Sequence, residues 1–393
     1  MKLSTLLSHF GEDSQQDPYG AVIPPLYQNS LFTFKDWDDI EEGFANPVDR
    51  CIYSRGNNPT VQIVEKKIAA LCGGEKAKLF GSGMGAISSA IMHYVKAGDH
   101  VLTINNIYGP TNNFLNNYLT SNMGLEVSFV EGDNLQEIKG ALQDSTKLIY
   151  LESPSSVKFI LQDIKAISQM AKERGIKTVI DNTWATPIFQ KPLDMGIDLE
   201  VHSCSKYFGG HSDLVSGVIV GNTKDIEAIA ANEYALFGAA ASPFEAWLIL
   251  RSMRTMKLRL NQHMQTSIKV AEFLEAHPLI KQVNYPGLPS FKQYDLGQKQ
   301  MSGYTGLMSF EIDTDDLEKL KKFTNALKIF KLGVSWGGHE SLAFVPAVAY
   351  LQEMPRERFE EMKITLAMVR ISVGLEDAED LIGDLSIALE QVQ

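Results

Sequence analysis

The sequence predicts an α/β protein in which a large domain with a mostly parallel sheet precedes a smaller C-terminal α/β domain. From about residue 61 to 250, short apolar runs alternate with helical patterns, as strands and covering helices do in a parallel sheet. A helical pattern without proline then runs from about Phe244 to Glu275 and ends at His277-Pro278. Strands are fewer beyond it. We therefore expect an N-terminal arm over 1–60, a ligand-binding domain over 61–250 and a C-terminal domain over 251–393.

The predicted strands are short and rich in β-branched and aliphatic residues. In the large domain they are A-K-L-F (77–80), H-V-L-T-I-N (100–105), E-V-S-F-V (126–130), K-L-I-Y-L-E (147–152) and T-V-I-D (178–181), with further runs around Val201 and Val218. Helical segments are expected at 82–95, 110–121 and 163–174. In the C-terminal domain we expect strands at 305–312 and 368–373, and helices at about 315–327 and 377–391.

Residues 1–60 differ in composition from the rest of the chain. They contain five prolines, a cluster of acidic residues and little helical periodicity. Proline fixes its own backbone angle and donates no hydrogen bond, so such a segment favours an extended chain. We therefore expect an extended arm, which needs another surface to lie against.

Composition excludes several classes of protein. The 393 residues carry a formal net charge of −12 and are 44% apolar, which indicates sizeable cores and argues against binding of nucleic-acid backbones by bulk charge. The three cysteines, Cys51, Cys72 and Cys204, are far apart and form no C-x-x-C, which is typical of a reducing compartment. The N-terminus reaches acidic residues too early for a signal peptide, and no apolar run approaches the roughly 18 residues of a membrane span. We expect a cytoplasmic protein with no membrane or nucleic-acid partner.

A glycine-rich turn follows the first predicted strand, in the stretch L-F-G-S-G-M-G-A. Gly81, Gly83 and Ala86 fit G-x-G-x-x-A, and Asp99 lies 18 positions after Gly81, as in a dinucleotide-binding motif. A ribose-binding acid should follow the next strand, whereas Asp99 precedes the strand at 100–105. The turn instead predicts a cradle for a single phosphate, formed by the backbone N–H groups of Ser82, Gly83, Met84 and Gly85. A dinucleotide-dependent oxidoreductase is the alternative that this motif alone would favour.

Two further residues identify the ligand more closely. Lys206 follows an apolar run that predicts a buried strand, where an unpaired ammonium is costly. Asp181 ends the strand T-V-I-D, at the carboxyl edge where open α/β sheets bind ligands. This pair matches the needs of pyridoxal phosphate, because the lysine forms an imine with it and the carboxylate pairs with its protonated ring nitrogen. A surface lysine and a helix-capping aspartate are the alternatives.

At these residues the sequence resembles the Cys/Met-metabolism family of fold-type I pyridoxal-phosphate enzymes, which have a transferase-like fold. The family includes cystathionine lyases and synthases and methionine gamma-lyase. The resemblance spans essentially the whole chain, through the blocks Y-S-R-G-N-N-P-T (53–60), S-G-M-G-A (82–86), Y-G-P-T (108–111), L-E-S-P (151–154), D-N-T-W-A-T-P (181–187), S-C-S-K-Y (203–207) and V-R-I-S-V-G-L-E (369–376).

The resemblance implies a role for each matching residue. Lys206 would be the Schiff-base lysine, Asp181 the partner of the pyridine nitrogen, and Tyr108 a catalytic residue that stacks on the ring. Further cofactor contacts would come from Ser82, Gly83, Met84, Thr183, Ser203 and Ser205. The substrate carboxylate would bind Arg370, a bidentate task that suits a guanidinium. Other substrate contacts would come from Ser335, Trp336, Ser156 and Tyr53.

The resemblance also implies that the N-terminal arm contacts a neighbouring subunit. Tyr53 and Arg55 match the tyrosine and arginine with which family members grip the cofactor phosphate of a neighbouring subunit. The implied active unit is a homodimer, and the family pattern suggests a homotetramer built as a dimer of dimers.

Two departures from the family pattern indicate a branch. The block E-S-P-S-S-V places Ser156 where the family commonly has asparagine, and V-S-W-G-G-H-E-S places Trp336 beside Ser335. Both look most like the bacterial cystathionine beta-lyases of transsulfuration, which cleave L-cystathionine by beta-elimination to homocysteine, pyruvate and ammonia. Y-S-R-G-N-N-P-T and S-G-M-G-A-I-S are closer to gamma-acting members, so cystathionine gamma-lyase, methionine gamma-lyase, and cystathionine gamma-synthase or acylhomoserine sulfhydrylase are the alternatives.

The remaining candidates receive structural interpretations. His211 more often serves as a hydrogen-bonding residue than as a catalyst, because Lys206 already supplies a base, and His339 lies either at the substrate mouth or on an exposed loop. No His/Cys/Asp cluster has metal-ligand spacing, so we expect no catalytic metal. A protein that uses the cofactor pocket only as a sensor would not need the Lys206, Asp181, Tyr108 and Arg370 set.

Overall fold

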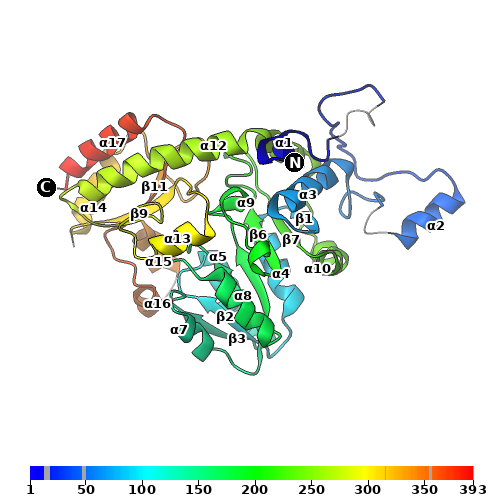
Figure 1. Ribbon diagram of the computed structural model, residues 1–393, viewed down its shortest axis with the longest axis horizontal. Coiled ribbons are helices and arrows are strands. Elements are labelled where there is room, and N and C mark those ends of the chain that lie inside the picture. Colours follow the sequence, from blue (N-terminus) through cyan, green and yellow to red (C-terminus); the bar gives the residue numbers. More distant parts are fainter. Residues whose placement is uncertain (13–17, 47–49, 315, 354–355, 393) are drawn as a thin grey trace.

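The protein is built around two sheets that one long helix connects (Figure 1). The computed structural model describes residues 1–12, 18–46, 50–314, 316–353 and 356–392. The larger sheet has seven strands in the order β1-β7-β6-β5-β4-β2-β3, and the smaller has five in the order β10-β11-β12-β9-β8. The helix α12 (Pro243–Ala276) contributes Met253 and Leu260 to the core beside the large sheet, and Val270 and Leu274 to the core beside the small one.

The large sheet confirms the predicted mostly parallel architecture. Its strands are β1 (Lys76–Phe80), β2 (His100–Ile104), β3 (Glu126–Val130), β4 (Thr146–Glu152), β5 (Lys177–Asp181), β6 (Leu199–Ser203) and β7 (Gly217–Gly221). Strands β2 to β6 run parallel to their neighbours, and β7 runs antiparallel between β6 and β1. The carboxyl ends of β4, β5 and β6 therefore meet at one edge of the sheet.

The helices of this part follow the strands in alternation. They are α3 (Pro59–Cys72), α4 (Gly83–Tyr94), α5 (Gly109–Asn113), α6 (Thr120–Met123), α7 (Leu135–Gly140), α8 (Ile164–Glu173), α9 (Thr186–Phe189), α10 (Thr223–Ile229) and α11 (Ala235–Phe237), with π-helical segments at η1 (Phe114–Leu119) and η3 (Ala230–Tyr234) and a 3₁₀ turn at η2 (Leu193–Met195). The helix α4 begins at Ser82 because the serine oxygen accepts a hydrogen bond from the Gly85 N–H. Its buried face, with Ala86 and Ile87, packs over the sheet and leaves its N-terminus at the carboxyl edge.

The C-terminal part contains the predicted strands and helices and several shorter elements. The predicted ones are β9 (Leu307–Ile312), β12 (Met368–Ser372), α14 (Leu317–Ala326) and α17 (Ala378–Glu390). The others are β8 (Ile280–Asn284), β10 (Lys331–Leu332), β11 (Leu342–Phe344), α13 (Tyr294–Gln300), α15 (Pro346–Glu353) and α16 (Arg356–Glu361). Such short segments carry little periodicity of their own. The boundary expected near residue 250 falls inside α12, and the division into domains stays a prediction.

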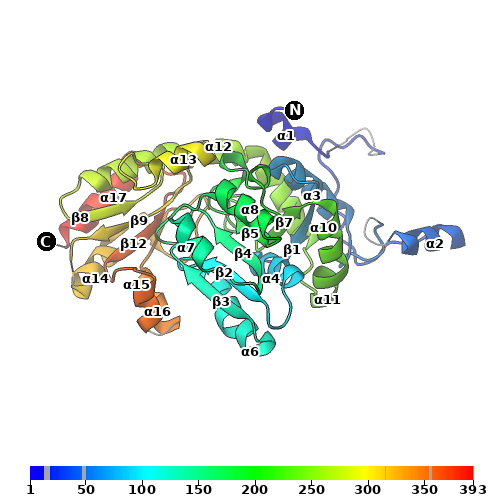
Figure 2. The same ribbon diagram turned by 60° about the horizontal axis from the view of Figure 1, so that its bottom comes forward.

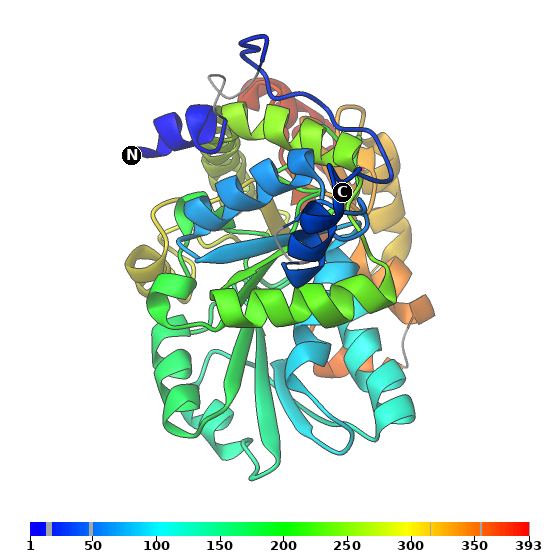
Figure 3. The same cartoon turned by 90° about the vertical axis from the view of Figure 1, so that its right-hand side faces the viewer.

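The N-terminal segment differs from the extended arm that its composition predicted, because it contains two helices. The helix α1 (Leu3–His9) lies beside α12 (Figure 3) and buries Leu7, and Glu12 pairs with Lys67 and Arg254. The helix α2 (Trp37–Ala45) stands away from the body (Figure 2) and begins at Asp36, whose side chain accepts from the Asp39 N–H. A capping residue and spaced apolar side chains form helices here despite the nearby prolines.

The arm exposes several large apolar side chains. Tyr19 is 94% exposed, Trp37 72% and Phe44 64%. Apolar side chains of this size are more often buried than exposed. Among the described residues, no helix is both long and apolar enough to cross a membrane.

Candidate active site

One cavity of about 650 Å³ opens at the carboxyl ends of β4, β5 and β6. It is lined by nearly all of the residues that the sequence singled out: Ser82, Gly83, Met84, Tyr108, Ser156, Asp181, Thr183, Ser203, Ser205, Lys206, Ser335, Trp336 and Arg370. Tyr53 and Arg55 are absent from its lining within this chain. They lie together on the arm, with the Arg55 guanidinium carbon 5.2 Å from the centre of the Tyr53 ring.

Lys206 lies in the loop after β6 and reaches into the cavity. Its Nζ donates a hydrogen bond of 2.7 Å to Ser335 Oγ and lies 5.3 Å from the centre of the Trp336 ring. Burial, followed by the charge of Arg370, lowers the pKa of Lys206 to about 8. A lysine with that pKa is partly uncharged near neutral pH, so it can act as a nucleophile or as a base.

Asp181 ends β5 and is held by the loop that follows. The backbone N–H of Thr183 donates to Asp181 Oδ1 at 2.9 Å, and the Thr183 hydroxyl donates to the same oxygen. Thr183 in turn accepts from the Ser203 N–H at 2.8 Å. Burial raises the pKa of Asp181, whereas the Thr183 hydrogen bonds and the charges of His202 and Lys206 lower it. Both of these hydrogen bonds use Oδ1, so Oδ2 can accept from an N–H in the cavity.

The glycine turn forms a smaller anion cradle than the sequence suggested. The Gly85 N–H is bonded to Ser82 Oγ at 2.9 Å, so it is not available to a phosphate. The N–H groups of Gly83 and Met84 remain at the start of α4, where the helix dipole favours an anion. Only glycine fits at the neighbouring position 217, because a Cβ there would lie 2.3 Å from the Ser82 carbonyl oxygen.

The two serines near the lysine both line the cavity but differ in their contacts. Ser205 Oγ donates to the Ser216 carbonyl at 3.3 Å and accepts from the Ser216 N–H at 3.1 Å. Ser203 stands at the end of β6, where a Cβ on Gly83 would come within 3.0 Å of it. The close approach places a serine hydroxyl beside the start of α4.

Arg370 reaches the cavity from the small sheet. It lies on β12, paired with Phe344 on β11 and Ser309 on β9. Its Nη2 donates to the Val334 carbonyl at 2.7 Å, and its guanidinium carbon lies 4.8 Å from the centre of the Phe344 ring. Its remaining donors suit a carboxylate, so the cavity combines a guanidinium from the small sheet with an amine from the loop after β6.

Glu152 lines the same cavity and was not among the sequence candidates. It ends β4, directly beside Asp181 in the sheet register. The available signal was the one used for Asp181, namely an acidic residue at the carboxyl end of a predicted strand. Its partner Ser156 donates a hydrogen bond of 2.5 Å to Glu152 Oε1.

The two histidines and Asp99 lie outside the cavity lining. His211 Nδ1 lies 2.7 Å from the Gly209 carbonyl, and His339, which is exposed, lies 3.2 Å from Glu340 Oε2. Asp99 accepts from the Lys96 N–H in the turn before β2, at the edge of the sheet opposite the cavity. Asp99 therefore lies far from where a ribose would bind in a dinucleotide site.

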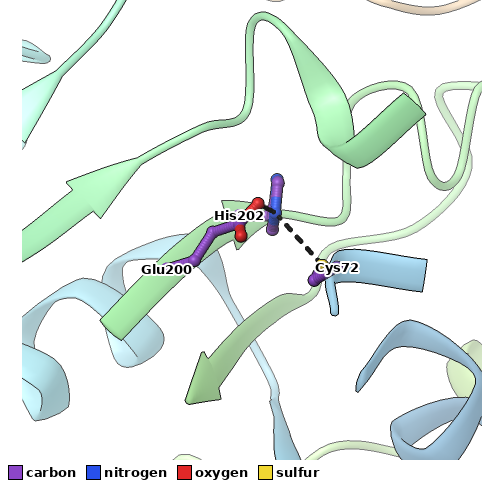
Figure 4. Close-up of side chains that lie close together, drawn as sticks. All are labelled: Cys72, Glu200 and His202. Atoms are coloured by element: carbon purple, nitrogen blue, oxygen red, sulfur yellow. Dashed lines mark hydrogen bonds and ion pairs between the residues drawn. The ribbon is translucent and has the colours of Figure 1, made fainter. Parts of the chain in front are cut away.

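A second polar cluster is buried between α3 and β6 (Figure 4). Cys72, Glu200 and His202 each offer one potential metal-ligand atom, and these atoms lie within 4.8 Å of one another. His202 Nε2 lies 2.7 Å from Glu200 Oε1 and 3.8 Å from Cys72 Sγ, and the Asn182 amide donates to Glu200. His202 contacts both Glu200 on its own strand and Cys72 on α3, so the cluster connects α3 to β6. The expected absence of a catalytic metal stays a prediction. It was based on spacing along the chain, which could not show that Cys72 lies beside His202 in the fold.

The lysine, the aspartate and the N–H cradle at one sheet edge fit pyridoxal phosphate, and together with the two-sheet architecture they define a fold-type I pyridoxal-phosphate enzyme. The family model for Cys/Met metabolism PLP-dependent enzymes matches residues 4–390, and the chain belongs to this family. It is accordingly a pyridoxal-phosphate-dependent lyase of sulfur amino-acid metabolism.

Known relatives and structures share nearly the full length of the chain. It is 41% identical to an L-methionine gamma-lyase of Porphyromonas gingivalis, over 96% of this chain and 94% of the relative. It is 39% identical to a cystathionine beta-lyase of Lactococcus lactis subsp. cremoris, over 95% of each chain. The crystal structure of metY from Campylobacter jejuni, with N'-pyridoxyl-lysine-5'-monophosphate, has a TM-score of 0.93 at 30% identity and covers 99% of this chain and 100% of its own.

Proposed function

We propose that the protein cleaves L-cystathionine by beta-elimination, so that L-cystathionine and water give L-homocysteine, pyruvate and ammonia. The observation that carries this proposal is the placement of Lys206 Nζ in one cavity with Arg370 and Asp181, against the Ser335 hydroxyl and the Trp336 ring. A carboxylate bound to Arg370 would direct the α-carbon of an amino acid toward the lysine.

Each side chain in the cavity has a proposed role in binding the cofactor or in moving a proton. Asp181 Oδ2 would accept the N–H of the cofactor ring, and the Gly83 and Met84 N–H groups would hold its phosphate. Pyridoxal phosphate, when bound, supplies an electron sink for the charge that develops at the α-carbon. Lys206 would take the α-proton, and Ser335 would orient the amine through the hydrogen bond that it accepts. A thiolate on the β-carbon could then leave.

An aromatic wall completes the substrate side of the cavity. Trp336, Phe344 and Tyr350, all from the C-terminal part of the chain, line the cavity. Apolar rings exclude water from the region where charge develops, which strengthens the electrostatic contacts made there. They also suit the methylene and sulfur part of a sulfur amino acid.

Gamma-elimination is the second candidate function. It is favoured by the first relatives found, which are L-methionine gamma-lyases at 38 to 41% identity. This route needs a further proton removal at the β-carbon before a γ-thiolate can leave, and Lys206 or Tyr108 would have to perform it.

The released keto acid distinguishes the two routes. With L-cystathionine we expect pyruvate and homocysteine, identified by mass spectrometry after incubation of the pyridoxal-phosphate-loaded protein. The Lys206→Ala protein is the control for breakdown of the substrate without the enzyme. Release of 2-oxobutyrate and cysteine, or faster release of methanethiol from L-methionine, would instead assign the protein to the gamma-acting branch.

We also propose that the arm completes the site of a second copy, in a homodimer that can pair into a tetramer. The exposed apolar side chains on the arm support a partner surface, and Tyr53 and Arg55 stand on the arm away from their own cavity. A guanidinium suits the phosphate of a cofactor held at the start of the partner's α4.

Substitution of Arg55 by alanine is therefore expected to weaken retention of the cofactor. Loss of a hydrogen bond to a charged group costs about 1.5–3 kcal/mol, which corresponds to a cofactor affinity roughly 10- to 150-fold lower. Absorbance titration of the apoprotein with pyridoxal phosphate measures this. Arg50→Ala, which removes an arm arginine that pairs with Asp39, is the matched control. A wild-type protein that is monomeric and fully active would contradict the proposal.

A further inference from the structure

Glu152 and Asp181 form a pair of buried carboxyl groups at the edge of the large sheet. They are direct register partners on the adjacent parallel strands β4 and β5, so their side chains leave the sheet on the same face. Glu152 is 8% exposed, Asp181 is also 8% exposed, and both line the cavity. Two carboxylates this close, away from water, do not readily carry charge at the same time.

Each carboxyl group has its own set of partners. Glu152 Oε2 accepts from the Tyr108 backbone N–H at 2.7 Å, and Oε1 accepts from Ser156. Asp181 accepts from Thr183 twice and feels the charge of Lys206. Glu152 therefore contacts two segments that contribute residues to the site, the start of α5 and the loop after β4.

The charges around the pair favour one arrangement of the proton. Burial, followed by the charge of Asp181, raises the pKa of Glu152 to about 8. The other titratable or charged groups near the pair are Arg370 from β12, Lys206 from the loop after β6, His202 on β6, Tyr150 on β4 and Tyr108 at the start of α5. Lys206 and the Thr183 donors stabilise the charged form of Asp181. At Glu152, burial and the charge of Asp181 outweigh the Tyr108 and Ser156 hydrogen bonds, which favour the charged form, so we expect the proton on Glu152.

We propose that Glu152 is a positioning residue that holds a proton at neutral pH, keeps Asp181 as the single carboxylate facing the cofactor, and fixes Tyr108 through its backbone N–H. The proposal rests on the role of Asp181 in the proposed function but not on the choice between beta- and gamma-elimination. It also gives Ser156 a role on the protein side of the site, because its hydroxyl reaches Glu152.

The proposal makes the stability of the apoprotein depend on pH with a definite sign. A carboxyl group whose folded pKa lies above its unfolded pKa binds more protons when folded, so stability falls as pH rises between the two values. For Glu152 this interval runs from 4.5, the ordinary value, to about 8. Lys206 titrates in the wild type and in Glu152 variants alike, so the difference between the proteins reports on Glu152.

The test compares Glu152→Gln with the wild type in the absence of substrate. Glutamine keeps an oxygen for the Tyr108 N–H and resembles the protonated acid, so we expect the variant to bind pyridoxal phosphate with an affinity within about threefold of wild type. We expect its urea stability to decline less between pH 5 and 8 than that of the wild type, because Glu152 no longer titrates while Asp181, whose pKa burial also raises, still does. Glu126→Gln, at the opposite end of the sheet, is the control and should retain the decline. An unchanged pH profile in Glu152→Gln would overturn the proposal.

A second measurement on the wild type covers the case in which the variant does not fold. Infrared difference spectra of the apoprotein should show the band of a protonated carboxyl group at pH 6.5 that disappears by pH 9.5. A wild type without this band would overturn the proposal, and its presence would support it. Because no substrate is used, a gamma-acting enzyme would give the same results, so a wrong substrate assignment is distinguishable from a wrong role for Glu152.

Discussion

Replacing Lys206 with alanine is expected to abolish turnover and the visible absorbance of the protein-bound cofactor. The amine is the only group described in the cavity that has a pKa lowered to about 8 by burial and lies within hydrogen-bonding distance of Ser335. Removing a general base typically lowers the rate by about 10²–10⁴-fold, and here the variant also loses the group that attaches the cofactor. We therefore expect kcat to fall by at least about 10³-fold.

The measurement is single-turnover keto-acid release, with absorbance scans of the loaded protein. Lys172→Ala on α8 removes an exposed lysine and is the matched control, expected to behave as wild type. Lys206→Arg keeps a cation and the approximate volume, so it separates loss of the base from loss of packing. Normal activity in Lys206→Ala would refute the assignment of the site as a whole.

Replacing Asp181 with asparagine is expected to lower kcat by about 10²–10³-fold, the range seen when one preorganised electrostatic contact is removed. Asparagine keeps the size and can still accept from Thr183, but it carries no charge to stabilise a protonated ring nitrogen. The effect should fall on kcat more than on the KM for the amino acid, because the residue proposed to bind the substrate carboxylate is Arg370 and not Asp181.

Steady-state kinetics with the loaded variant measure this separation of kcat from KM. Asp144→Asn, in an exposed turn before β4, is the control for a lost surface charge. A kcat within about threefold of wild type would exclude Asp181 as the partner of the ring nitrogen. A change confined to KM would place it on the substrate side instead.

The large sheet could be predicted from the sequence because each of its strands has a recognisable local pattern. Each is a short apolar run beside a helical pattern, and a parallel sheet brings the carboxyl ends of such strands to one edge. Asp181 and Lys206 could therefore be assigned to the same edge from their positions in that order. The arm was predicted less well, because the Asp36 cap and the spaced apolar residues of α2 were outweighed by the proline content.

Glu152 shows why part of the site could not be assigned in the same way. Its position at a strand end was visible, but its register opposite Asp181 and its bond to the Tyr108 N–H depend on how β4, β5 and the start of α5 pack. The Gly85 N–H is a second example. The sequence predicted that it would donate to a phosphate, but in the folded turn it donates to Ser82 Oγ.

The sequence by itself determined the order along the chain of the strands in the large sheet, the sheet edge at which the cavity opens, and the lysine, aspartate and glycine turn that stand there. These features depend on local spacing and on the chemistry of single residues. The tertiary structure alone decided that Arg370 reaches the cavity from the other sheet, that Cys72 meets His202, and that burial shifts the pKa values of Lys206 and Glu152 toward neutrality. The physical reason is that desolvation and charge coupling depend on distances between segments far apart in the chain, which only packing establishes.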